Sequence, residues 1–244
     1  YPLTANYSCY DAAMPITRSV KTPVILLAIA AAIGMIDSSY LILQYLAALA
    51  SDGAPTPCSP STLVNCTKTV QGTWGHLLAI PNPMLGMLWY SGAFLYGIAR
   101  AFGTPFTRNS KIFVGITLGL GVAFSYVLYI ASILILRGVC PFCLLSTVMA
   151  TVIALAFVVD DAAGPNSIMH GTKHRLAIGL FQIFSFIAFV IGLPVFLGIW
   201  MPLLLDPMEA VRHWSFPAMV ILIIVMLTAH VWAYRKLKKA ADTV

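Results

Sequence analysis

Six apolar stretches divide the chain, and each is about as long as a membrane-spanning helix. They cover residues 24–50, 84–99, 112–136, 141–159, 176–200 and 216–234. A helix of about 20 apolar residues crosses the roughly 30 Å hydrocarbon core of a bilayer. The pattern therefore predicts six transmembrane helices joined by polar loops.

The composition supports an all-α, polytopic membrane protein. Of the 244 residues, 60% are hydrophobic and only 9% are charged, whereas roughly a quarter of a soluble domain is charged. The net charge of +6 fits basic residues at the edges of a membrane. It gives no reason to expect a nucleic-acid partner.

The basic residues also predict an orientation in the plasma (inner) membrane, since lysine and arginine concentrate in cytoplasmic loops. We place both termini in the cytoplasm. The inner side then holds Arg18, Lys21, Arg100, Arg108, Lys111, Lys173, Arg175, Arg235, Lys236, Lys238 and Lys239, and the outer side only Lys68, Arg137 and Arg212. The polar loop 51–81 and the start of the fourth stretch then share the periplasmic, or extracytoplasmic, side.

A cysteine pair, Cys140-Pro-Phe-Cys143, opens the fourth stretch. Cysteines three positions apart share a face of a helix. Pro141 suits the first helical position and makes Cys140 a cap residue. The N-terminus of a helix favours the reactive thiolate. The pair predicts redox chemistry; the alternatives are two small buried residues or half of a zinc site. We expect no metal, because the other cysteines do not form a second Cys-x-x-Cys.

Cys58 and Cys66 form a second pair in the outer loop, eight positions apart. A disulfide between them would be either a static staple or a shuttle to the membrane pair by thiol–disulfide exchange. Both pairs lie on the oxidising side of the membrane. Cys9 falls in the cytoplasm, where we expect a reduced, structural thiol.

Electrons that reach Cys140 and Cys143 need an acceptor. A flavin or nicotinamide cofactor needs a phosphate-binding loop, and the sequence contains no glycine-rich one. A quinone dissolved in the lipid, either menaquinone or ubiquinone, suits a cysteine pair at the top of a helix bundle.

Three other polar or polarisable residues are candidates for the site. Asp37 lies inside the first apolar stretch, where a carboxyl group is costly unless it is paired or hydrated. Asp37 is either part of a proton path or of the quinone-pocket wall, or it is an acid that is protonated or hydrogen-bonded to neighbouring hydroxyl groups. His76 could transfer a proton or be an interfacial loop residue. Met84 could touch a quinone ring, or be an ordinary bundle or lipid contact.

Four segments of the chain resemble the vitamin K epoxide reductase (VKOR) family, in particular its bacterial disulfide-forming members. The segments are Cys58–Cys66, Trp74-Gly75, Ile80–Gly86 and Cys140–Cys143. The resemblance implies a four-helix catalytic core around a quinone pocket at residues 23–160. Residues 1–22 would be a cytoplasmic segment, and residues 161–244 two additional transmembrane helices with a basic cytoplasmic tail.

The resemblance also implies roles for individual residues. Cys58 would receive electrons from a separate DsbA-like thioredoxin-fold protein, Cys66 would attack the membrane disulfide at Cys140, and Cys143 would react with the quinone. Asn82 matches a position that hydrogen-bonds a quinone oxygen, and Trp74 belongs to a half-helix that covers the pocket.

Two positions depart from the family pattern. Thr147 stands where the vertebrate members have a tyrosine, and Gly72 replaces a common loop serine. The first departure argues against epoxide reduction, although Thr147 still falls at the expected pocket wall.

We expect a membrane thiol oxidase that reoxidises a thioredoxin-fold protein and passes electrons to a quinone, supporting disulfide formation. One alternative is a structural subunit of a larger membrane complex, with permanent disulfides and the last two spans as a docking surface. Another is a vitamin K epoxide or quinone reductase.

Overall fold

The computed structural model describes residues 21–50, 66, 72–76, 80–136, 140–163, 168 and 215–242. This part of the chain is helical and contains no strand. The helices are α1 (Lys21–Ala50), the short 3₁₀ helix η2 (Thr73–His76), α3 (Asn82–Ala101), α4 (Arg108–Leu134), α5 (Pro141–Ala163) and α8 (Ser215–Asp242). The predicted span 176–200, Cys9 and Cys58 lie outside the described residues.

Three of the described helices are long and apolar enough to cross a membrane. They are α1, α4 and α5, over Thr22–Ala50, Arg108–Ser132 and Pro141–Ala162. The predicted second and sixth spans correspond to α3 and α8. The prediction of an all-α membrane protein is therefore confirmed.

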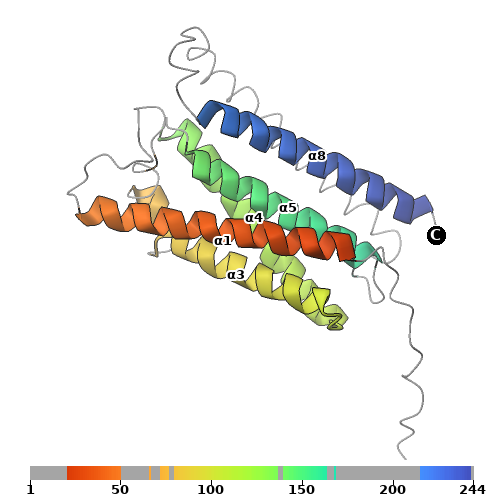
Figure 1. The fold of residues 1–244 in the computed structure, drawn as a ribbon. Helices are drawn as coiled ribbons and strands as arrows, with labels where there is room; N and C mark the ends of the chain where they lie inside the picture. Colours follow the sequence, from red (N-terminus) through yellow and green to blue (C-terminus); the bar gives the residue numbers. More distant parts are fainter. Residues whose placement is uncertain are drawn as a thin grey trace, which may run out of the picture.

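The helices α1, α3, α4 and α5 form a bundle, and α8 lies along α5 (Figure 1). α5 packs against α1, α4 and α8, whereas α3 packs mainly against α1. Of the three membrane-crossing helices, α5 is the most buried and α4 the least. The central position of α5 places its N-terminal cysteines between neighbouring helices.

Small residues bring α1 and α3 close together. A Cβ atom at Gly34 would collide with the ring of Tyr90, and one at Gly86 would come within 2.9 Å of the Ser38 hydroxyl oxygen. Such small residues let the backbones of membrane helices approach closely. This contact fixes Ser38 and the start of α3 beside each other.

Two buried ion pairs tie α3 and α4 to the C-terminal end of α5. Arg100 donates to both carboxylate oxygens of Asp160, at 3.0 and 2.9 Å, and the Lys111 Nζ lies 3.2 Å from Asp161. Both carboxylates are fully buried. The pairing lets α5 continue to Ala163, beyond the end at residue 159 that the apolar pattern predicts.

We expect Asp160→Asn to lower the Tm of the detergent-solubilised protein, because the variant leaves the Arg100 guanidinium buried without its carboxylate. Breaking a buried ion pair in this way costs about 3–5 kcal/mol. The double variant Arg100→Met with Asp160→Leu removes both charges and should recover most of that loss. If Asp160→Asn unfolds at the wild-type temperature, the Arg100–Asp160 ion pair does not stabilise the fold.

Candidate active site

Cys140 and Cys143 lie at the N-terminal end of α5, and both are free thiols. The Cys140 carbonyl accepts the first helical hydrogen bond, from the Leu144 N–H at 3.1 Å, as expected of a cap residue. The Cys143 N–H donates to the Cys140 sulfur at 3.2 Å. A backbone donor at a helix N-terminus stabilises negative charge on that sulfur.

Cys66 lies between α1 and η2 in the sequence and contacts Cys140. Its Sγ lies 3.4 Å from the Cys140 Sγ, and neither residue is exposed to solvent. Both pack against Leu41 of α1. The two sulfurs are in contact, so exchange between them needs little backbone movement.

Cys66 is itself joined in a disulfide. Its bonded partner lies outside the described residues, because both other described cysteines are free. The site thus holds one disulfide sulfur against a reduced pair.

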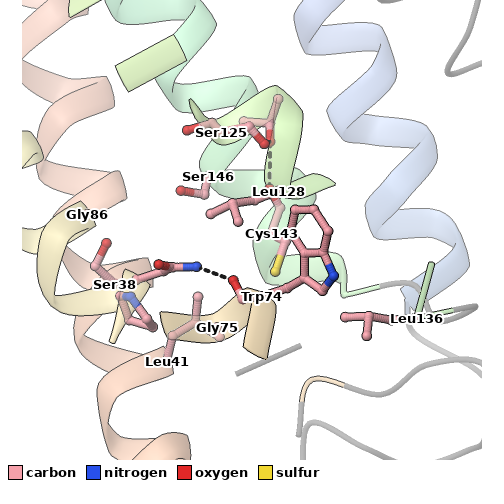
Figure 2. Close-up of a pocket in the computed structure, with 13 residues that line it drawn as sticks. Ser38, Leu41, Trp74, Gly75, Gly86, Ser125, Leu128, Leu136, Cys143 and Ser146 are labelled. Atoms are coloured by element: carbon pink, nitrogen blue, oxygen red, sulfur yellow. Dashed lines mark hydrogen bonds between the residues drawn. The ribbon is translucent and has the colours of Figure 1, made fainter. Parts of the chain in front are cut away.

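Cys143 faces a pocket enclosed by η2, α1, α3, α4 and α5 (Figure 2). The lining includes Ser38, Trp74, Asn82, Cys143, Ser146 and Thr147, together with apolar residues such as Leu41, Leu128 and Leu136. The surroundings are mostly apolar, with a few polar groups. This is the usual character of a site for a small organic ligand.

Asn82 connects the η2 side of the pocket to α3. Its side-chain Nδ2 donates to the Trp74 carbonyl at 2.6 Å, and Pro83 follows it in the first turn of α3. Its Oδ1 is buried and has no hydrogen-bond partner among the described residues. The amide nitrogen carries a second hydrogen, so Asn82 can hold the η2 segment and still donate to a ligand.

Thr147 lines the pocket one turn after Cys143. Its hydroxyl donates to the Cys143 carbonyl at 2.8 Å and lies 3.3 Å from the Ser125 carbonyl. The single hydroxyl hydrogen is committed to the backbone. Thr147 therefore offers a ligand a methyl group and a lone pair, in contrast to the phenol of a tyrosine.

The other candidates lie beside the pocket rather than in its wall. His76 Nε2 bonds the Tyr45 hydroxyl at 3.1 Å, which joins η2 to α1. Met84 is 39% exposed, and Asp37 is buried next to the lining residue Ser38. The described lining contains none of these three candidates.

The sequence did not single out Ser38, Ser125 and Ser146 as pocket residues. The only signal was that each is a small polar residue inside an apolar run. Ser146 is fixed by Tyr90, whose hydroxyl lies 2.7 Å from the Ser146 carbonyl and 2.8 Å from its Oγ. These serines supply polar groups to an otherwise apolar wall.

The fold and the site together define a helical membrane protein with a cysteine pair between a disulfide and an apolar pocket. The model of the vitamin K epoxide reductase family matches residues 25–159, which is more than half of the chain. The chain belongs to this family. It is therefore a membrane oxidoreductase with a quinone-linked redox function. The matched region includes all four cysteines of the two predicted pairs and Asn82, whereas α8 lies beyond it.

No curated protein and no solved structure matches the chain.

Proposed function

We propose that the chain is a quinone-dependent thiol oxidase that reoxidises an extracytoplasmic, DsbA-like thioredoxin-fold protein and so supports disulfide formation. The observation that carries the proposal is the row of sulfurs. Cys66 contacts Cys140 at 3.4 Å, and Cys143, one helical turn further, faces the pocket. Electrons can pass along this row from the loop to the apolar site.

In the proposed relay, a dithiol of the partner protein reduces the Cys58–Cys66 disulfide and is itself oxidised. The Cys66 thiolate then attacks Cys140 in the Cys140–Cys143 disulfide, and Cys143 leaves as a thiolate. Cys58 resolves the Cys66–Cys140 bond and releases Cys140.

The pocket suits a quinone, either ubiquinone or menaquinone, as the oxidising substrate. A bound quinone accepts two electrons and two protons and leaves as the quinol. The apolar walls suit a flat ring, and the second N–H of Asn82 can donate to a ring carbonyl. On the protein side, the Cys140 and Cys143 thiols close to a disulfide, which restores the starting state.

The arrangement of the helix ends supports the proposed topology. The N-terminal end of α1 and the C-terminal end of α8 lie at one end of the bundle, and η2 lies at the other (Figure 1). Arg235 and Lys236 are exposed near the end of α8. Because basic residues favour the cytoplasmic side, we place both termini there and the cysteines on the periplasmic side.

Titration of thiols with and without quinone tests the proposed function. The protein is reduced, freed of reductant without air, and mixed with a short-chain ubiquinone or menaquinone. We expect two thiols to disappear for each quinol formed. An unchanged thiol content would overturn the oxidase and favour a structural subunit with locked cysteines.

A further inference from the structure

We propose that Asp37 is a proton-transfer residue for quinone reduction at the Cys143 pocket, an inference that rests on the function proposed above. Asp37 lies on α1 and is only 3% exposed. Neither of its carboxylate oxygens has a hydrogen-bond partner among the described residues. The proposed relay of sulfurs does not involve this carboxyl group.

The buried carboxylates at the other end of the bundle are each paired with a basic side chain. Asp160 is paired with Arg100, and Asp161 with Lys111. Asp37 has no such cation among the described residues. Because an unpaired charge is costly in an apolar environment, we infer that Asp37 is held as the neutral acid, with a proton to give.

Asp37 lies on the part of α1 that borders the pocket. The following residue, Ser38, lines the pocket, and Gly34, three positions before Asp37 and on the same side of the helix, lies against the ring of Tyr90 on α3. The Tyr90 hydroxyl is bonded to Ser146, another pocket residue. These hydroxyl groups, with a bound water to bridge the gaps, offer a path from Asp37 to the pocket.

The proton balance gives Asp37 a defined task. Closing the Cys140–Cys143 disulfide releases two electrons and the two thiol protons, and forming the quinol consumes both electrons and two protons. Asp37 donates one proton to the quinone oxygen as the electrons arrive. Its carboxylate then takes up one of the two thiol protons as the disulfide closes, and the other thiol proton goes to the second quinone oxygen, so the protons balance and Asp37 ends each turnover protonated.

The test compares Asp37→Asn with the wild-type full-length protein in detergent, with dithiothreitol as donor and a short-chain quinone as acceptor. Positioned general acids contribute about 100- to 10,000-fold, so we expect kcat to fall at least about 100-fold. The KM for quinone should change little, since Asp37 does not line the pocket. Asp37→Glu should recover part of kcat because it restores a carboxyl group.

Ser39→Ala is the matched control on the same turn of α1. The Ser39 hydroxyl donates to the Met35 carbonyl at 2.8 Å and is not part of the described pocket lining. We expect this variant to keep the wild-type kcat. If it loses as much activity as Asp37→Asn, the effect belongs to packing of α1 and the inference is overturned.

Infrared spectroscopy detects the proton on the Asp37 carboxyl group directly. We expect wild-type protein to show a protonated-carboxyl band that shifts on isotope labelling of aspartate and is lost in Asp37→Asn. Labelling identifies an aspartate band in the wild type even if the variant is unstable.

Three further outcomes overturn the inference: no such aspartate band in the wild type, a band that persists in Asp37→Asn, or a wild-type kcat in Asp37→Asn. These leave the oxidase intact as long as wild-type protein reduces quinone. Wild-type protein that fails to reduce quinone overturns the proposed function and the inference with it.

Discussion

Cys143→Ala should reduce quinone turnover to the background rate. Cys143 is the described cysteine that faces the pocket, and without it Cys140 has no neighbour on α5 with which to close a disulfide. The two electrons then have no route from the loop sulfurs to the quinone. The measurement is the loss of quinone absorbance without air, with dithiothreitol as donor, at matched protein concentrations.

A covalent trap accompanies this loss. In Cys143→Ala the Cys66 sulfur still lies against Cys140. The Cys140 thiolate can attack Cys66 in the loop disulfide and release Cys58 as a thiol, so we expect a Cys66–Cys140 disulfide, visible by mass mapping without reduction. Cys9→Ala is the matched control, since the sequence places Cys9 apart from the relay, and should keep wild-type turnover. Substantial quinone reduction by Cys143→Ala would remove Cys143 from the mechanism.

The sequence predicted most of the helical framework because the length of an apolar run sets the length of a membrane helix. The predicted span 24–50 corresponds to α1, and 112–136 to α4, with ends that differ by a few residues. The end of α5 was less predictable. Asp160 and Asp161 resemble the start of a polar loop, and their basic partners are about 50 to 60 positions away in the sequence.

The site was predictable where a residue type itself limits the chemistry. The cysteine pair, the cap at Cys140 and Pro141 at the first helical position follow from local spacing, and Asn82 and Trp74 follow from the family resemblance. The inward face of each helix was not predictable. In a membrane helix both lipid-facing and core-facing residues are apolar, so the sequence could not show that Ser125 and Ser146 line the pocket while Met84 lies outside its lining and is partly exposed.

Because Cys66 is buried, a protein donor of electrons and a small dithiol should depend on the loop pair to different extents. Cys66 and Cys140 are inaccessible to solvent, so a thioredoxin-fold protein cannot place its own cysteines against them. In the proposed relay such a donor reacts at Cys58. A small dithiol can diffuse between side chains and reduce the inner sulfurs without that step.

Cys58→Ala should therefore abolish quinone reduction driven by a reduced thioredoxin-fold protein and retain most of the reduction driven by dithiothreitol. In this variant the free Cys66 can form a dead-end bond with Cys140, which the small dithiol can open. The measurement is the rate of quinol formation with each donor. The double variant Cys58→Ala with Cys66→Ala is the control, because it removes the dead end and leaves only direct reduction of Cys140–Cys143.

The ratio of the two rates decides whether the loop pair is a shuttle. An equal loss with both donors would mean that Cys58 supports the inner site structurally, as a static staple would. Retained turnover with the protein donor would mean that the partner reaches the membrane pair by another route. Only a loss confined to the protein donor fits electron entry at the loop, because in the proposed relay the protein donor alone must react at Cys58.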